Sequence, residues 1–217
     1  MGEKMKVMGK VTVTLLLMLI VSLFLTSCSG VVTPELQLGL DGEINKVEEI
    51  VSVYLEVPYE KYAGTNWCLP ASGAMTFKYF GENITQQEIA NAVITDGASS
   101  VYKMINYARD LGFEAKYNYM TIDEIKELLR EDIPVIAIQN YSLALPYCHA
   151  RVITGYNDEK QEIINNDPTA GEDYIMSYSD FTALNTGSNP DLFKVIVIST
   201  EEIDTKDTVL ANNENNS

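Results

Sequence analysis

The chain has 217 residues, of which 31 are acidic and 15 basic, and its formal net charge at pH 7 is -16. This length fits about one domain, and the 46% of hydrophobic residues supply enough apolar material for an ordinary core, which excludes a wholly disordered chain. The acidic balance argues against nucleic-acid binding, because phosphate contacts need clustered Lys and Arg, and no such cluster occurs outside the extreme N-terminus. The single histidine, His149, excludes multi-histidine metal sites, so any imidazole chemistry depends on that residue.

The first residues predict a secretory targeting segment. Three lysines precede the apolar run VTVTLLLMLIVSLFL at residues 11–25, and small residues follow it, which is the order of a signal peptide. Segment 25–28, Leu-Thr-Ser-Cys, resembles a bacterial lipobox, in which the cysteine becomes the first mature residue and carries lipid. We therefore expect residues 1–27 to be a lipoprotein signal peptide and Cys28 to be lipidated. The alternative is an uncleaved transmembrane anchor, and both interpretations place the domain outside the cytoplasm.

Composition divides the rest of the chain into three parts. Residues 28–50 are polar and mixed, and we expect a spacer. Residues 51–200 contain the regular hydrophobic patterns and predict one domain. Residues 201–217 end in Asn-Asn-Glu-Asn-Asn-Ser and predict a disordered tail.

The first half of the predicted domain carries helix signals. Thr85 and Thr121 each stand three residues before a glutamate, which is the spacing of a capping box. Gly81 and Gly112 stand where helical patterns stop. After a strand at 51–57, we therefore predict helices at 68–80, 85–94, 99–111 and from 121 onward.

The second half carries strand signals. Short segments rich in β-branched residues are separated by turn residues, and we predict strands at 135–138, 150–156, 162–165 and 193–199. A helical first half followed by a strand-rich second half predicts an α+β domain. A cleft between two such halves is a common place for a site.

Cys68 is the first candidate for chemistry, because it lies where a predicted loop becomes a predicted helix. The N–H groups at a helix start point outward and the helix dipole favours negative charge, so a thiol there loses its proton more easily. Cys68 is therefore a candidate nucleophile. The small residues at 71–74 would let a strand that carries a base approach this helix closely.

His149 and Asp167 are candidates for the base and for the group that orients it. His149 begins a predicted strand that could present its ring to Cys68 across the cleft. Asp167 comes eighteen residues later, which suits a neighbouring antiparallel strand after a short turn. Asn165 or Asn166 could orient the ring instead, and an aspartate before a proline is also a common turn residue.

Several segments, in this order, carry a family resemblance: VPY at 57–59, NWCLPASGAM at 66–75, YFG at 79–81, TQQEIA at 85–90, IPVI at 133–136, HARVITGY at 149–156 and NDP at 166–168. Together they resemble the C39-like branch of papain-like cysteine peptidases over residues 51–199, and Phe181 fits a short helix of that family. The resemblance implies a papain-like fold, in which Cys68 is the nucleophile, His149 the base and Asp167 the orienting residue. It also implies a peptide or peptide-like substrate and no cofactor.

The chain departs from that family at the expected oxyanion site. The family usually has a glutamine about six residues before the cysteine, and here that position is Tyr62. Asn66, together with the backbone N–H of Cys68, is the candidate oxyanion donor. Leu69 stands where a glycine is frequent in the family.

The cysteines allow a second interpretation. With Cys28 lipidated, Cys68 and Cys148 would be the remaining pair, and an extracellular pair is often a disulfide. A zinc site is disfavoured, because only three ligands are available and two of them, Cys148 and His149, are adjacent on a strand.

The sequence therefore predicts a membrane-anchored extracellular cysteine peptidase or amide hydrolase with a Cys-His-Asp triad and an acyl-enzyme intermediate. We expect a monomer without metal, cofactor or nucleic acid, held at the extracellular face of the membrane by its lipid. The alternative is a catalytically weak or inactive lipoprotein of the same fold that binds a peptide or a cell-wall ligand.

Overall fold

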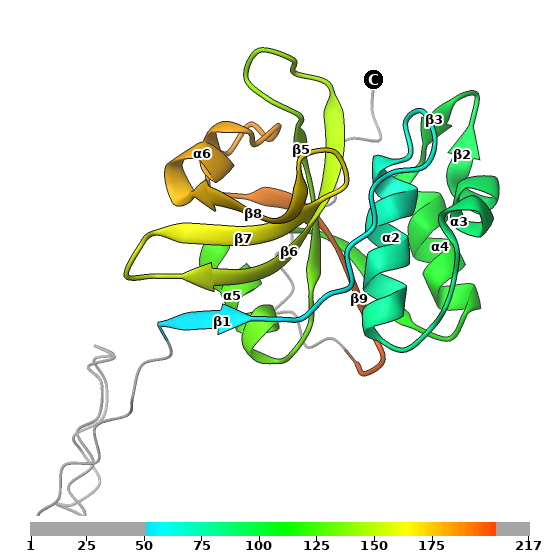
Figure 1. Cartoon of the computed structure of the whole chain (residues 1–217), viewed down its shortest axis with the longest axis horizontal. Helices are drawn as coiled ribbons and strands as arrows, with labels where there is room; N and C mark the ends of the chain where they lie inside the picture. The colour runs from blue at the N-terminus through cyan, green and yellow to red at the C-terminus, as the bar shows by residue number, and fades with distance from the viewer. Residues whose placement is uncertain (1–50, 203–217) are drawn as a thin grey trace, which may run out of the picture. The chain divides into compact units, whose positions relative to one another are not determined.

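The computed structural model describes residues 51–202, and their helical part comes first along the chain (Figure 1). The predicted signal peptide, Cys28, the spacer and residues 203–217 of the predicted tail lie outside the described residues. The helices are α2 (Cys68–Tyr79), α3 (Gln86–Val93), α4 (Val101–Asp110), α5 (Ile122–Arg130) and α6 (Tyr178–Ala183). None of the helices within residues 51–202 has both the length and the apolar character that crossing a membrane requires.

Side-chain caps explain where these helices begin. Thr85 and Thr121 each form a complete capping box with the glutamate three residues later, so both predicted boxes are confirmed. Ser100 accepts a hydrogen bond from the N–H of Lys103 and begins α4 slightly later than predicted. Each of these hydroxyls satisfies an N–H that the first helical turn leaves without a partner.

The sheet has seven antiparallel strands. Six of them lie in the order β4 (Glu114–Met120), β9 (Phe193–Ser199), β5 (Val135–Asn140), β6 (Cys148–Asn157), β7 (Glu162–Asp167) and β8 (Gly171–Ser177). The seventh, β1 (Ser52–Tyr54), is shorter than predicted and pairs with the end of β6. A separate pair, β2 (Ile94–Thr95) and β3 (Ala98–Ser99), lies between α3 and α4. The predicted α+β fold, with a helical first half and an antiparallel second half, is confirmed.

Strand β6 carries His149 and lies in the middle of the sheet half of the domain. It pairs with β5 along its first part, with β1 along its last part, and with β7 on its other edge. Gly155 lies at a register shift in the β6–β7 pairing, and a Cβ there would lie 2.4 Å from the carbonyl oxygen of Val53. The close approach of β1 therefore requires glycine at this position.

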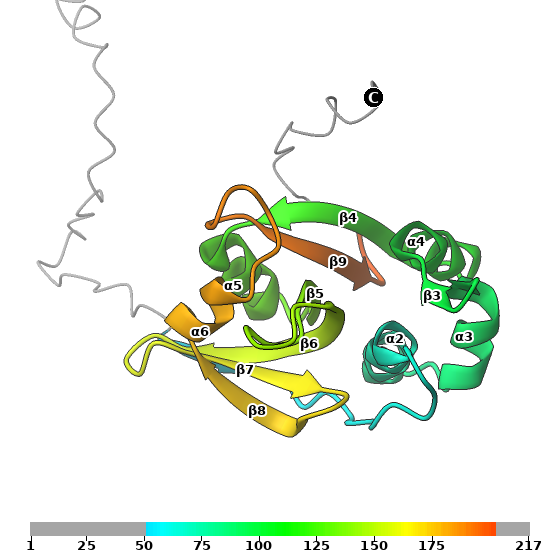
Figure 2. The same cartoon turned by 90° about the horizontal axis from the view of Figure 1, so that it is seen from above.

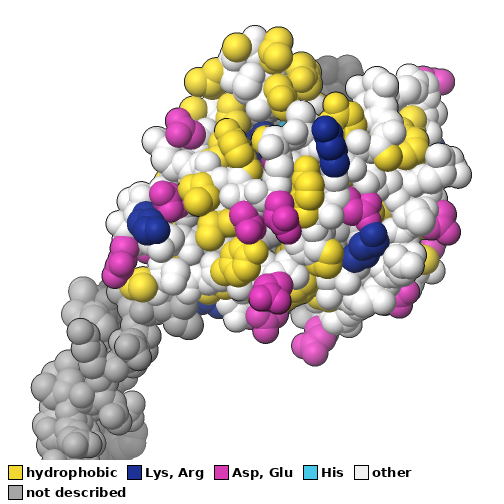
Figure 3. Space-filling model, viewed as in Figure 1, with side chains coloured by type: hydrophobic (Ala, Val, Ile, Leu, Met, Phe, Trp, Pro, Cys, Tyr) yellow, Lys and Arg dark blue, Asp and Glu magenta, His cyan; other side chains and the backbone are white. Residues whose placement is uncertain are grey.

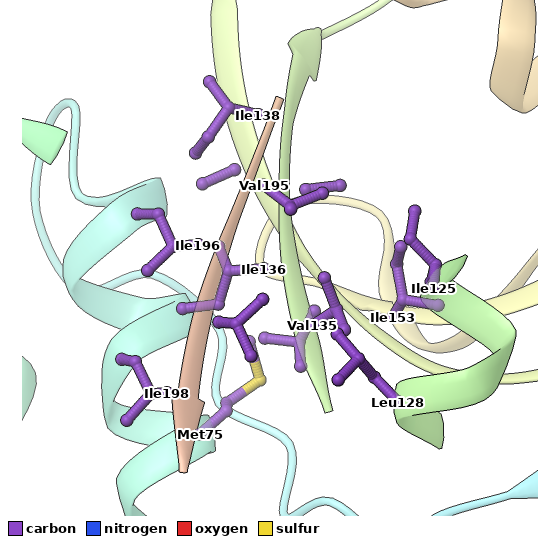
Figure 4. Close-up of a cluster of buried hydrophobic side chains, with 14 of the residues drawn as sticks. Met75, Ile125, Leu128, Val135, Ile136, Ile138, Ile153, Val195, Ile196 and Ile198 are labelled. Atoms are coloured by element: carbon purple, nitrogen blue, oxygen red, sulfur yellow. The ribbon is translucent and has the colours of Figure 1, made fainter. Parts of the chain in front are cut away.

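Apolar side chains cover both faces of the central strands (Figure 4). Ile136, Ile196 and Ile198 lie on the side of α2, where they meet Met75. Val135 lies on the opposite side with the side chains of α5. Burial on both faces explains why β5 and β9 read as continuous apolar runs rather than alternating ones.

Seen from above, α2, α3 and α4 form a group beside the sheet, and α2 is the helix next to β6 (Figure 2). The predicted use of the small residues in α2 is corrected at Gly73. A Cβ on Gly73 would lie 2.2 Å from the methyl carbon of Met104, so this glycine admits α4 rather than the strand with the base.

Candidate active site

The loop before α2 fixes where Cys68 lies. The side chain of Gln86 accepts a hydrogen bond from Ala63 N–H at 3.0 Å and donates to Glu60 at 2.6 Å. Asn66 has a φ of 64°, a left-handed conformation that asparagine tolerates better than most residues. The chain then enters α2 with Cys68 at the first helical position and its side chain half-buried.

His149 joins Cys68 to Asp167. Its Nε2 lies 2.9 Å from Oδ1 of Asp167, and its ring lines the same cleft as the Cys68 thiol, with which it interacts electrostatically. Because Asp167 occupies Nε2, Nδ1 is the ring nitrogen left for the sulfur. The three predicted residues, which come from α2, β6 and β7, are therefore brought together in one region.

The surroundings of these groups favour a thiolate and an imidazolium. Burial opposes ionisation of Cys68, but hydrogen bonds from His149 and from the N–H groups of Ala150 and Leu69 outweigh it and lower the pKa of the thiol. Burial likewise disfavours the charged ring of His149, yet its bonds to Asp167 and Cys68 raise the pKa of the imidazole. A thiol with a lowered pKa beside a base with a raised pKa is an activated nucleophile.

Asp167 stays ionised although it is buried. Burial raises its pKa, but the bond to His149 and the positive charge of Arg151 act more strongly and hold the pKa of this carboxyl well below its usual range. Two backbone N–H groups assist, since Thr169 and Ala170 donate to Oδ1 at 2.8 and 3.1 Å. Asp167 therefore has both roles that the sequence suggested: it orients His149, and it accepts hydrogen bonds within the turn that follows it.

The two neighbouring asparagines are engaged elsewhere. Asn165 donates to the carbonyl of Tyr174 at 2.6 Å, and Asn166 donates to the carbonyl of Val57 at 2.8 Å. Both side chains tie strands together instead of contacting the imidazole. Of the three candidates for orienting His149, Asp167 is the one that lies against the ring.

Arg151 is a residue of the site that the sequence analysis missed. It is only 2% exposed and donates from Nε to Oδ2 of Asp167 at 3.1 Å and from Nη1 to Oε1 of Gln139 at 2.8 Å. A signal existed in the sequence, because Arg151 follows His149 by two positions and so lies on the same face of the strand. A buried arginine on that face requires an acidic partner nearby.

Cys68 and His149 open onto a cleft of about 530 Å³ between the helical group and the sheet, and Asp167 lies behind the ring, outside the cleft lining. This lies within the range of small-ligand sites and confirms the predicted cleft between the two halves. Apart from the catalytic candidates, its walls are mainly aromatic, aliphatic or uncharged; they include Tyr62, Thr65, Trp67, Leu69, Val101, Ile138, Tyr141 and Tyr147. The walls carry no lysine, arginine, aspartate or glutamate among the described residues.

The loop between β5 and β6 adds an exposed apolar rim. Figure 3 shows hydrophobic side chains gathered at the end of the molecule where Figure 1 places this loop. Leu143 is 71% exposed, and Leu145 and Tyr147 are also exposed. Tyr147 stacks on Tyr141 with ring centroids 5.0 Å apart, and Tyr141 meets the His149 ring edge to face at 5.2 Å. The rim is thus continuous with the wall beside the base.

The candidate oxyanion donor also lines the cleft, but its amide already has a partner. Asn66 Nδ2 donates to the carbonyl of Gly97 at 3.0 Å. One hydrogen of that amide therefore remains for another acceptor. The N–H groups at the start of α2 lack intrahelical acceptors, so that of Cys68 is free of the helix ladder and is available to a substrate oxygen.

The second cysteine of the described chain lines the same cleft. Cys148 is exposed, and both it and Cys68 are free thiols in the structure. Burial and the nearby Cys68 raise the pKa of Cys148, which makes it the less reactive thiol. Residues 51–202 contain no group of three or more His, Cys, Asp or Glu side chains placed to hold a metal ion.

Known proteins resemble this domain in its sequence pattern and in its fold. Residues 54–186 match the model of the Peptidase_C39 like family. A search of curated proteins gave no match. Among solved structures, the double glycine motif protease from an AMS/PCAT transporter, in complex with its leader peptide, is similar at 20% identity and a TM-score of 0.54, covering 68% of this chain and 94% of that one. The peptidase domain of Streptococcus ComA, a bifunctional ABC transporter, is similar at 19% identity and a TM-score of 0.54, covering 67% of this chain and 100% of that one.

Proposed function

The chain belongs to the Peptidase_C39 like family, and on that basis we propose that it is a cysteine peptidase in which Cys68, His149 and Asp167 form the catalytic triad. The observation that carries the proposal is that His149, hydrogen-bonded through Nε2 to Asp167, shares one cleft with the Cys68 thiol and interacts with it electrostatically. The substrate is a peptide or a peptide-like amide, by likeness to the double glycine motif protease that was solved with a leader peptide. The chemistry needs no cofactor.

In the proposed reaction, Nδ1 of His149 takes the proton of Cys68 and the thiolate attacks the carbonyl carbon of the scissile amide. The C–N bond then breaks, and the imidazolium gives its proton to the leaving amine. Water, deprotonated by His149, hydrolyses the thioester and returns the thiol. Asp167 holds the ring throughout and stabilises its positive charge.

We assign the oxyanion site to the backbone N–H of Cys68 and to the amide of Asn66. Only one amide hydrogen of Asn66 is available, because the other is donated to Gly97. Two donors aimed at the developing charge lower the barrier of acyl transfer, and each contributes about 3 kcal/mol in well-studied hydrolases. Substitution of Asn66 by Gly, which removes the amide but suits the φ of 64°, therefore separates this assignment from that of the triad.

We also propose that the enzyme works outside the cytoplasm as a lipid-anchored monomer. The support is the order of lysines, apolar run and Leu-Thr-Ser-Cys in residues 1–28, with Cys28 as the lipidated residue and residues 28–50 as the spacer before the domain at 51–200. The net charge of -16 disfavours direct contact with anionic lipid or nucleic acid, so the lipid would supply the attachment.

A second candidate function is binding without turnover. Tyr62 and Leu69 both line the cleft at positions where the family usually has a glutamine and a glycine. These changes favour a protein that keeps the fold and holds a peptide or a cell-wall ligand in the same cleft. The two functions differ in whether the bound amide is cleaved.

Thiol labelling tests the proposed triad. The full chain, purified without reductant, is treated with iodoacetamide, and the labelled positions are mapped by mass spectrometry in wild type, His149→Ala and Cys148→Ser. We expect fast labelling of Cys68 that slows by about 10-fold or more in His149→Ala and is unchanged in Cys148→Ser. A Cys68 that resists label, or that is isolated in a disulfide with Cys148, would contradict the triad.

Cleavage then separates the peptidase from the binding protein. A mixture of unrelated peptides is incubated with wild type and Cys68→Ala, and new termini are identified by mass spectrometry. The peptidase produces termini that are lost at least about 1000-fold in Cys68→Ala. Peptide retention without new termini, together with a reactive Cys68, would favour the binding function.

A further inference from the structure

Arg151 carries a positive charge beneath the site without reaching the cleft. It is among the largest fully buried side chains of the described chain, and it does not line the cavity that holds Cys68 and His149. A buried cation is costly unless it is paired and hydrogen-bonded, and an apolar residue of similar size often stabilises a core equally well. The hydrogen-bond partners of the Arg151 guanidinium therefore indicate the role of its charge.

The contacts divide the oxygens of Asp167 between two tasks. Oδ1 faces His149 Nε2 at 2.9 Å and accepts from two backbone N–H groups, whereas Oδ2 accepts from Nε of Arg151 at 3.1 Å. The guanidinium thus fixes the carboxylate from the side away from the ring. A carboxylate held at one oxygen only could rotate about its Cβ–Cγ bond.

Arg151 is itself held by β5 and the segment after it. Gln139 Oε1 accepts from Nη1 at 2.8 Å, and the amide of Gln139 donates to the carbonyl of Phe181 at 2.8 Å. The carbonyl of Tyr141 accepts from Nη2 at 3.4 Å. Gln139 is also the register partner of His149, so the support of the arginine and the strand position of the base are linked.

We propose that Arg151 is a positioning residue of the catalytic site, whose guanidinium fixes one oxygen of Asp167 so that the other stays aimed at His149 and the carboxylate stays ionised whether or not the imidazole is protonated. The inference rests on the proposed function. During the reaction the ring alternates between neutral and charged, and a buried aspartate beside a neutral ring would otherwise tend to take up a proton. Arg151 supplies the constant positive charge that the ring does not.

Few groups around Asp167 titrate in acid. The titratable and charged groups that interact with Asp167 are His149 and Arg151 from β6, Tyr59 from the loop before α2, and Tyr147 from the β5–β6 loop. Burial and the nearby Asp167 raise the pKa of Tyr59, so that phenol stays neutral in acid. Below about pH 5 the imidazole is protonated and the arginine is charged, which leaves Asp167 as the group whose protonation is observed.

The single histidine of the chain allows a direct test, because its ring proton signals in an NMR titration are unambiguous. We compare the full chain as wild type, Arg151→Met and Arg151→Lys, each in a Cys68→Ala background that removes the thiol. Protonation of Asp167 should appear as a second inflection of the His149 signal at acid pH. In Arg151→Met we expect this inflection at a pH at least about one unit higher than in the protein that keeps Arg151. In Arg151→Lys the charge is kept, so we expect the inflection to return toward its original position.

Reactivity of Cys68 supplies the second readout, in proteins that keep the thiol and carry Cys148→Ser. We expect the alkylation rate at pH 6 to fall about 10-fold in Arg151→Met and severalfold in Arg151→Lys, since an ammonium cannot reach three acceptors in one plane. Arg130→Met is the matched control, because Arg130 lies in α5, outside the cleft lining, and donates to the hydroxyl of Tyr156, so its loss should change stability without changing either readout.

The outcomes separate the two proposals. If both Arg151 variants lower the urea midpoint but leave the His149 titration and the alkylation rate of Cys68 unchanged, Arg151 is structural only and the inference is overturned. If Arg151→Met does not fold, an Arg151→Lys variant with the wild-type alkylation rate overturns it as well. If instead wild-type Cys68 shows no histidine-dependent labelling, the proposed function fails, while the titration still reports whether Arg151 keeps Asp167 ionised.

Discussion

The two halves of the domain contribute to the site in different ways. Of the proposed triad, the helical half provides Cys68, at the half-buried start of α2. The sheet half provides His149, Arg151 and Asp167, all nearly fully buried and joined by hydrogen bonds. The difference indicates that the nucleophile is left open to the substrate, whereas the base is fixed in place before any substrate arrives.

Neutralising Asp167 should disturb the sheet half most. Asp167→Asn removes the charge that pairs with buried Arg151, and we expect the free energy of unfolding to fall by about 3 kcal/mol or more. The alkylation rate of Cys68 should fall by about 10- to 100-fold, because the ring loses its orienting carboxylate. Urea unfolding and labelling kinetics measure the two effects.

Asp173→Asn is the matched control for that variant. Asp173 accepts from the exposed hydroxyl of Tyr54 at 3.0 Å, and asparagine suits its positive φ of 48°. We expect a change within about 0.5 kcal/mol and no change in labelling. Equal losses in the two variants would remove the contrast between buried and exposed carboxylates.

The pH dependence of stability should show a medium-sized effect. The lowered pKa of Asp167 gives stabilisation that is complete above about pH 4 and is lost as the pH falls through the folded-state value. The raised pKa of His149 gives stabilisation that is complete below about pH 6.5 and is lost as the pH rises through its folded-state value. In a Cys68→Ala background, the contribution of this pair to the free energy of unfolding should therefore be largest between these limits.

Urea titrations at several pH values check this profile. His149→Ala should remove the decline on the alkaline side, and Asp167→Asn should weaken the decline in acid. A profile that is unchanged in both variants would show that the pair does not link protonation to folding.

The smallest effect is expected at a helix cap of the helical half. Thr85→Ala removes the side-chain acceptor for Glu88 N–H and one of the two donors to the Glu88 carboxylate, and keeps the backbone N–H donor, which should cost about 1 kcal/mol. The alkylation rate of Cys68 should stay within twofold of wild type, because α3 holds no residue of the triad. A large loss of reactivity would show that the helical half is coupled more tightly to the site than its contacts indicate.

The helices could be predicted because local signals determine their ends. Thr85, Thr121 and the glycines at 81 and 112 act within a few residues of themselves, and the structure begins or ends helices at these places. Strands β4 and β8 are absent from the predicted elements for two different reasons. Tyr117 and Tyr119 in β4 alternate with polar residues, which is a strand pattern that the predictions above did not use. Strand β8 begins Gly-Glu-Asp, which reads as a loop until β7 pairs with it.

Within the site, the sequence yielded the three residues that meet but not the arrangement that supports them. The choice among Asn165, Asn166 and Asp167 depends on a register shift between β7 and β8, which no local pattern encodes. The pairing of Arg151 with Gln139 and Asp167 depends on contacts across three strands. The catalytic roles of Cys68, His149 and Asp167 and the oxyanion role of Asn66 stay predictions until the labelling and substitution experiments are done.

Strand β6 has a consequence for how the domain opens and closes. Because it pairs with β5, β7 and β1, its amides can exchange with solvent only when neighbouring strands separate. The first turn of α2 has no side-chain cap at Trp67, and its opening does not require strands to separate. Transient unfolding of the first turn of α2 would therefore move the Cys68 sulfur away while the His149 ring stays in place. The site would re-form when this turn refolds.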